Sequence, residues 1–208
     1  MRSVAGVILA GGQSSRMGGG DKCLLPLGDR VMLDHVLARF QPQVSALALN
    51  ANGDAARFAR FGLPVISDSF SGFQGPLAGV LAGLDWAASA GFDHIVTVSA
   101  DTPFFPCDLV AQLQLQAETS GAPIVLAATN GEPRRKHRHP TFGLWPVDLR
   151  DDLREALHRG IRKVVAWSDT HGASEAVFPA TGGIEPFFNI NTPDDMGAAQ
   201  KMIKGQKQ

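Results

Sequence analysis

A chain of 208 residues is long enough for one domain with a substantial core, because proteins of this size bury roughly 70% of the surface that the unfolded chain exposes. Its 19 lysines and arginines balance 20 aspartates and glutamates, so no global field favours a nucleic acid or an anionic membrane. Two cysteines cannot form a disulfide framework, and the short apolar run near residue 1 is typical of neither a signal peptide nor a membrane span. We therefore expect one cytoplasmic domain, residues 1–208, that binds anions only locally.

Apolar runs of strand length alternate with helical patterns through the first half of the chain. This alternation is typical of βαβ units and a mainly parallel sheet. The patterns predict strands at residues 4–10, 46–51, 64–67 and 94–100 and helices at 31–40, 54–61, 77–90 and 106–119. The strands are almost continuously apolar, as is usual when helices cover both faces of a sheet. Pro106 is predicted at the first position of its helix.

The second half has a less regular pattern. It predicts a strand at 123–128, a turn at Asn130 and Gly131, a returning strand at 141–145, a charged helix at 148–159, a short strand at 176–179 and a closing helix from Pro193. The segment 161–167 fits either a helix or a strand. We predict an α/β fold: a Rossmann-like three-layer sandwich with a mainly parallel, partly mixed sheet.

The motif LAGGQSSRMGGGDK at residues 9–22 follows the first predicted strand. Glycine lets backbone N–H groups turn toward an anion, and Arg16 and Lys22 supply positive charge where a polyphosphate would lie. The motif is not a Walker A loop, since Cys23 follows Lys22, and it lacks the G-x-G-x-x-G dinucleotide fingerprint. Ligands of open α/β sheets bind beyond the carboxyl ends of strands, which favours a phosphate site over a solvated surface loop.

Two aspartates also follow predicted strands. Asp101 ends the sequence HIVTVSAD, where a carboxylate could enter the same crevice and serve as a hard oxygen ligand for Mg²⁺. The alternative is that Asp101 only begins a turn before Pro103. Asp68, in VISDSF, repeats this placement and could bind a ribose hydroxyl or a loop N–H.

Three further motifs have both a structural and a functional interpretation. GFQGPLAG, residues 72–79, allows close backbone approach to a planar or phosphorylated ligand at a helix N-terminus, or else only a tight entry to a buried helix. The basic run at 134–140 could grip a phosphorylated second substrate together with Thr141, although a solvated hairpin tip is the commoner outcome. In FFNINTPDD, residues Thr192, Pro193 and Asp195 fit a helix start, whereas Asn189 and Asn191 are left over for a ligand or a turn.

With these motifs in order, the chain resembles the molybdenum cofactor guanylyltransferase family, within the larger group of nucleotide-diphospho-sugar transferase-like nucleotidyltransferases. The resemblance rests on LAGGQSSRMGGGDK, NAN at 50–52, ISD at 66–68, GPLAG, DTP and NINTPDD, and it covers nearly the whole chain. It implies transfer of GMP from GTP to the terminal phosphate of molybdopterin carrying molybdenum, with release of pyrophosphate. Relatives that transfer cytidylyl groups usually have LAAG, so Gly11 and Gly12 favour guanine.

The resemblance also implies roles for individual residues. It implies catalytic roles for Arg16, Lys22 and Asp101, with Mg²⁺ on Asp101. The residues expected to bind GTP are Leu9, Ala10, Gly11, Gly12, Lys22, Asn50, Asp68, Gly75, Pro76, Leu77 and Asp101. Those expected to face molybdopterin are Arg138, His139, Pro140, Thr141, Asn189 and Asn191.

Such a reaction needs placement and charge neutralisation more than a general base. The alternatives are a related transferase that uses CTP or a sugar-1-phosphate acceptor, or a GTP-binding protein without catalysis. Partner molybdoenzymes or chaperones would receive the product, and neither nucleic acid nor membrane is expected as a partner.

Overall fold

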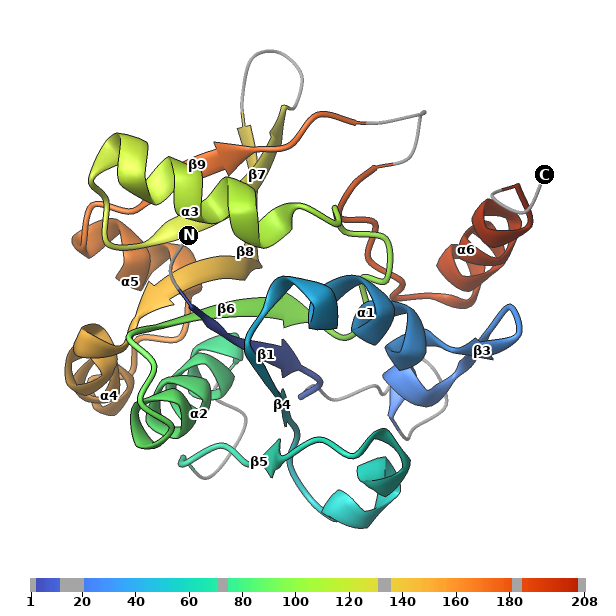
Figure 1. The fold of residues 1–208 in the computed structure, drawn as a ribbon, viewed down its shortest axis with the longest axis horizontal. Coiled ribbons are helices and arrows are strands. Elements are labelled where there is room, and N and C mark those ends of the chain that lie inside the picture. Colours follow the sequence, from blue (N-terminus) through green and yellow to red (C-terminus); the bar gives the residue numbers. More distant parts are fainter. Residues whose placement is uncertain (1–2, 12–20, 71–74, 131–135, 181–184, 206–208) are drawn as a thin grey trace.

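The computed structural model describes residues 3–11, 21–70, 75–130, 136–180 and 185–205. Within these residues a seven-stranded sheet forms the middle of three layers, with helices on both faces (Figure 1). Its strands lie in the order β5-β4-β1-β6-β8-β7-β9. They are β1 (Ala5–Leu9), β4 (Ala46–Asn50), β5 (Val65–Ile66), β6 (His94–Ser99), β7 (Val125–Asn130), β8 (Lys136–Pro146) and β9 (Ser174–Val177).

The sheet is mainly parallel and partly mixed, as the sequence predicts. β1 pairs in parallel with β4 and β6, β4 with β5, and β7 with β9. Only β8, among the described strands of this sheet, runs antiparallel to its neighbours β6 and β7. A separate hairpin joins β2 (Pro26–Leu27) to β3 (Arg30–Val31), which the sequence patterns do not predict.

The helices divide between the two faces. They are α1 (Met32–Phe40), α2 (Pro76–Ser89), α3 (Leu109–Ser120), α4 (Arg150–His158), α5 (Val164–Thr170) and α6 (Pro193–Gly205). α1 and α3 pack on one face, and α2, α4 and α5 pack on the other. Alternation along β1 serves both layers, because Ile8 belongs to the first core and Val7 and Leu9 to the second. α6 packs instead with the β2–β3 hairpin, through Leu27 and Ile203.

Several predicted elements have different boundaries or another form. Residues 55–61 form a 3₁₀ helix, η4 (Ala55–Phe61), rather than an α-helix. The helix predicted from Pro106 begins at Leu109, with Asp108 at its N-cap, so the prediction for Pro106 is wrong. Residues 161–167, which fitted a helix or a strand, include the start of α5.

β8 is the largest departure, because it extends back through the described part of the basic run to Lys136. The remaining 3₁₀ helices are η2 (Lys22–Leu24), η3 (Gln41–Gln43) and η5 (Val147–Leu149). No helix in the described part of the chain has the length and apolar character needed to cross a membrane.

The strand register aligns the carboxyl ends of three parallel strands. Leu9 of β1 lies beside Asn50 of β4 on one side and Ser99 of β6 on the other. Antiparallel β8 brings Thr141 to the same edge, where its carbonyl oxygen accepts a hydrogen bond of 2.9 Å from the Thr97 hydroxyl. After β1 the chain continues toward the β5 end of the strand order, and after β6 it continues toward the β9 end. The strand order therefore reverses between β1 and β6, and open α/β sheets bind ligands at such a switch point.

Candidate active site

A pocket of about 670 Å³ opens at this carboxyl edge. Segments from four strands, the N-terminus of α2 and the stretch before α6 form its walls. The lining residues are Leu9, Ala10, Gly11, Asp21, Asn50, Asn52, Arg57, Asp68, Phe70, Gly75, Pro76, Gly79, Ser99, Asp101, Thr141 and Asn189. Most residues that the sequence predicts to bind a nucleotide therefore lie together. Gly12 and Arg16 lie outside the described residues.

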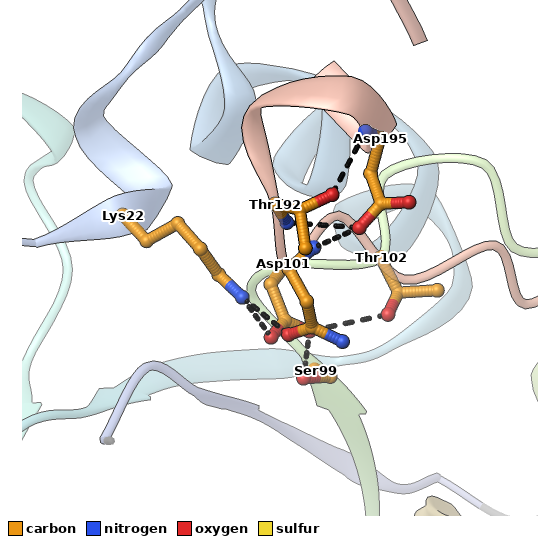
Figure 2. A network of polar contacts seen from close by, with 7 residues as sticks. Lys22, Ser99, Asp101, Thr102, Thr192 and Asp195 are labelled. Atoms are coloured by element: carbon orange, nitrogen blue, oxygen red, sulfur yellow. Dashed lines mark hydrogen bonds and ion pairs between the residues drawn. The ribbon is translucent and has the colours of Figure 1, made fainter. Parts of the chain in front are cut away.

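Lys22 and Asp101 meet at the centre of this edge (Figure 2). The Lys22 ammonium lies 2.7 Å from Asp101 Oδ2, and both side chains are largely buried, at 15% and 22% exposure. The hydroxyl of Ser99 donates to Asp101 Oδ1 over 2.6 Å, and that of Thr102 donates to the same oxygen over 3.2 Å. Three donors thus hold one carboxylate at the end of β6, facing the residue that ends the glycine-rich motif.

The segment before α6 completes this cluster. Lys22 also donates to Asn191 Oδ1 over 2.9 Å, and the N–H of Ile190 donates to the backbone carbonyl of Asp101. The two asparagines of this motif have different surroundings, because Asn189 lines the pocket whereas Asn191 accepts a hydrogen bond from Lys22.

The predicted start of α6 has the form of a capping box. The N–H of Thr192 donates to Asp195 Oδ2 over 2.8 Å, and the N–H of Asp195 donates to the Thr192 hydroxyl over 3.1 Å. The N–H of Asn191, followed by the contact with Thr192, holds the pKa of Asp195 below its usual value. The cap therefore fixes the chain beside Lys22 as well as starting the helix.

Asn50 and Asp68 form the opposite wall. Asn50 Nδ2 donates to Asp68 Oδ1 over 2.9 Å and to the backbone carbonyl of Ile66 over 3.2 Å. Asn52 binds Asp68 twice, since its Nδ2 donates to Oδ2 over 2.8 Å and its Oδ1 accepts from the Asp68 N–H over 2.9 Å. These amides hold the Asp68 carboxylate in one orientation.

The start of α2 approaches this wall closely. Gly75 is the N-cap, with a φ of 71° that favours glycine, and Pro76 follows at the first helical position. A Cβ on Gly79 would lie 2.3 Å from Asn50 Oδ1, so only glycine permits this approach. Leu77, in contrast, has a side chain wholly buried in the core beneath α2, away from the pocket.

In the described part of the basic run, Arg138 and His139 both have partners within the protein. Arg138 forms ion pairs with Glu175 at 2.5 Å and Asp169 at 2.6 Å, and the hydrogen bond with Glu175 is the main reason that its pKa is raised. His139 is buried against Phe187, with ring centroids 4.3 Å apart. Burial, with a smaller effect of the charge on His137, lowers the pKa of His139 to about 4.

The prediction that residues 138–141 contact a second substrate stays a prediction. Thr141 lines the pocket, whereas Pro140 and the side chains of Arg138 and His139 are not part of its described lining. His139 is neutral at pH 7 and Arg138 already has two carboxylate partners, so neither is presented as a free cation.

Comparisons with known proteins agree with this geometry. The family described as "MobA-like NTP transferase domain" matches residues 6–173. The "Molybdenum cofactor guanylyltransferase" of Mesorhizobium japonicum is 49% identical over 98% of this chain and 97% of its own length. The protein of the same name from a Bradyrhizobium species is 46% identical over 96% of this chain and 93% of its own. The chain belongs to the molybdenum cofactor guanylyltransferase family.

Solved structures of lower sequence identity have the same fold. "Molybdopterin-guanine dinucleotide biosynthesis protein A" of Archaeoglobus fulgidus has a TM-score of 0.76 and 22% identity, over 97% of this chain and all of that one. A 4-diphosphocytidyl-2C-methyl-D-erythritol synthase of Anaerococcus prevotii has a TM-score of 0.73 and 14% identity, over 98% of this chain and 96% of that one. These likenesses concern the fold alone, and they confirm the predicted fold class.

The donor set at this pocket would fit a magnesium ion bound together with a nucleotide. Asp101 offers a partly exposed carboxylate at the pocket, and Mg²⁺ in proteins commonly takes one or two carboxylates, substrate phosphates and waters. Among the described residues no group of three His, Cys, Asp or Glu side chains could hold a metal by itself. Asp101 could supply one carboxylate ligand to such an ion.

Six lining residues escape the sequence analysis as individual site candidates: Asp21, Asn52, Arg57, Phe70, Gly79 and Ser99. Asn52 and Asp21 lie inside the NAN and GGGDK motifs, which could have drawn attention to them. Phe70 lies two residues after Asp68 and packs edge-on against His158, with ring centroids 4.8 Å apart. Arg57 stands in η4, and no local pattern marks it, because its carboxylate partner Asp21 lies 36 positions earlier in the chain.

Proposed function

We propose that this protein transfers GMP from GTP to the terminal phosphate of molybdopterin carrying molybdenum, forming the guanine dinucleotide cofactor and releasing pyrophosphate. The observation that carries the proposal is the convergence of Lys22 and Asp101 beside a pocket whose other wall holds Asn50 and Asp68. One wall suits phosphates and the other suits a nucleoside, as transfer of a nucleotidyl group requires. Family membership supplies the identity of the two substrates.

In this proposal a phosphate oxygen of the acceptor attacks the α-phosphorus of GTP in line. A new P–O bond forms, the bond between the α-phosphorus and the bridging oxygen breaks, and pyrophosphate leaves with that electron pair. The attacking phosphate is already ionised, so no general base is needed. The chain's task is to hold both phosphates in line and to offset their negative charge.

Lys22 would place its ammonium against the departing phosphates, and Arg16 of the same motif would add a second positive charge. Asp101 would hold Mg²⁺, which would offset phosphate charge and polarise the α-phosphoryl group. The Ser99 and Thr102 hydroxyls hold the Asp101 carboxylate in one orientation. Asn191 helps to keep Lys22 beside Asp101, which lines the pocket.

Asn50 and Asp68 would bind the nucleoside portion of GTP, with the backbone of Leu9, Ala10, Gly11 and Gly12 and the α2 N-terminus at Gly75 and Pro76 close to the nucleotide. Thr141 and Asn189, which also line the pocket, would contact the acceptor. We also infer a reducing compartment such as the cytoplasm, since Cys23 and Cys107 are both free thiols. The product would then pass to molybdoenzymes or their chaperones.

A pyrophosphate release assay with purified protein, Mg²⁺ and molybdate-loaded molybdopterin tests the proposal. We expect release with GTP and formation of the dinucleotide cofactor, with much slower release from CTP, UTP or ATP. Preference for CTP, or turnover with a sugar 1-phosphate instead of molybdopterin, would identify a related transferase. GTP binding without any turnover would identify a binding protein.

A further inference from the structure

We infer that Arg57 is a positioning residue for the nucleotide, because it ties the end of the glycine-rich motif to the wall that holds Asp68. The inference rests on the proposed function and adds a residue that no motif of the sequence marks. Arg57 lines the pocket, with 27% of its side chain exposed.

Every nitrogen of the Arg57 guanidinium group binds an acceptor of the protein. Nε donates to the carboxylate of Asp21, Nη2 donates to the backbone carbonyl of Asn52 over 2.5 Å, and Nη1 donates to the backbone carbonyl of Asp54. The group also lies over the ring of Phe58, 4.6 Å from its centroid. An arginine held by four contacts serves to fix its neighbours rather than to receive a phosphate.

The residues that Arg57 joins lie on both halves of the pocket. Asp21 immediately precedes Lys22, which binds Asp101. Asn52 binds Asp68 through two hydrogen bonds. A continuous chain of contacts therefore links the Lys22–Asp101 pair, on the phosphate side, to Asp68 on the nucleoside side.

The local backbone is built around this contact. Asp54 caps η4 by accepting a hydrogen bond of 2.9 Å from the Ala56 N–H, and Phe58 anchors the same helix with 1% exposure. Gly53 has a φ of 83°, and a Cβ there would lie 3.5 Å from Arg57 Nη1. The turn at 52–54 thus wraps two carbonyl groups around the guanidinium group.

Lysine cannot reproduce this arrangement. An ammonium group could still pair with Asp21, but it lacks the planar fork that reaches two carbonyls at once. Alanine would remove all of these contacts and leave the Asp21 carboxylate without its cation beside the triphosphate. Both substitutions should therefore weaken GTP binding, with alanine having the greater effect.

The test measures GTP affinity by titration and steady-state KM and kcat for each substrate, in the wild type, R57A, R57K and D21N/R57A. We expect R57A to raise the KM and Kd for GTP about tenfold or more, as loss of hydrogen bonds to a charged group implies, with the acceptor KM within about twofold. R57K should lie between R57A and the wild type. The double variant should be no worse than R57A, because both changes remove the same contact.

Arg60 provides a matched control on the same helix. It also pairs with a carboxylate, Asp34 at 2.8 Å, and lies over an aromatic ring, Phe61 at 4.4 Å, but it is not among the described pocket-lining residues. We expect R60A to leave the KM for GTP unchanged. Equal effects of R57A and R60A, or wild-type GTP values in R57A and R57K, would overturn the inference.

The same measurements separate this inference from the proposed function. A wild-type protein that neither binds GTP nor releases pyrophosphate overturns the proposed function and this inference with it. A wild type that turns over GTP, with R57A and R57K unchanged, overturns the inference alone. If R57A unfolds below the assay temperature, R57K decides the outcome.

Discussion

At the residue scale, the Asp101 carboxylate has three donors of its own chain, of which Lys22 supplies the positive charge. Asparagine would keep the size of this side chain and remove its charge. We expect D101N to lower kcat roughly 100-fold or more, because the carboxylate that would hold Mg²⁺ against the phosphates loses its charge, while the thermal unfolding midpoint changes little. Pyrophosphate release and a thermal melt measure the two effects.

Asp148 is the control for this variant. Asp148 is exposed and lies in η5, the short helix that follows Pro146. Pro146 pairs with His94, which begins β6, whereas Asp101 follows the other end of that strand. D148N should retain full activity. Full activity in D101N would remove the proposed role of Asp101.

His139 provides a test that depends on pH. Its pKa of about 4 in the folded protein lies below its ordinary value of 6.5, so the unfolded chain binds more protons between these two pH values. The free energy of unfolding should be level above about pH 6.5 and fall as the pH drops toward 4, by roughly 2 kcal/mol at pH 5.

Urea unfolding at pH 7 and pH 5 measures this difference. In H139Q the decrease in the free energy of unfolding from pH 7 to pH 5 should be smaller than in the wild type. The exposed neighbour His137 is the control, because burial of His139, the larger cause of its lowered pKa, persists in H137Q. An equal pH dependence in the wild type and H139Q would contradict the assignment.

At the element scale, α2 depends on glycine to reach the sheet. A Cβ on Gly79 would lie 2.3 Å from Asn50 Oδ1 and 2.9 Å from Leu9 Cδ2. We expect G79A to lower the free energy of unfolding by about 1–3 kcal/mol and to weaken GTP binding, because Asn50 must move. Urea unfolding and GTP titration measure both effects.

The matched control is G197A in α6. Gly197 is exposed, and a Cβ there would meet nothing within 4 Å. The free energy of unfolding of this variant should be about 0.5–1 kcal/mol higher than that of the wild type, because alanine is the better helix former. Unchanged stability and GTP affinity in G79A would show that the α2 contact is not tight.

Local patterns predict elements well where the signal is contiguous. Thr192, Pro193 and Asp195 predict the start of α6, and the structure has the capping box there. Prediction is wrong where tertiary packing decides, as for the helix that begins at Leu109 rather than Pro106. β8 is longer than predicted because it pairs with β7 as far as Lys136, so the described part of the basic run belongs to the strand.

At the scale of the whole molecule, the pocket takes its walls from segments between Leu9 and Asn189. A ligand that binds all of them binds the folded state alone. We expect GTP with Mg²⁺ to raise the midpoint of thermal unfolding, since a ligand at 100 times its Kd adds about 2.7 kcal/mol of stability. CTP at the same concentration should raise the midpoint less. An equal shift with both nucleotides would argue against guanine selectivity.

The sequence by itself determined the fold class, the strand ends that carry Asn50, Asp68 and Asp101, and the glycine-rich motif with Lys22, because each depends on residues close together in the chain. Only the tertiary structure decided which of these residues meet. Lys22 contacts Asp101 and Asn191 because the strand register and the capped start of α6 bring these residues together. Arg57 binds Asp21, which is 36 residues away in the sequence, and Arg138 binds Glu175, which is 37 residues away. Such contacts arise from the packing of whole elements, which no short pattern encodes.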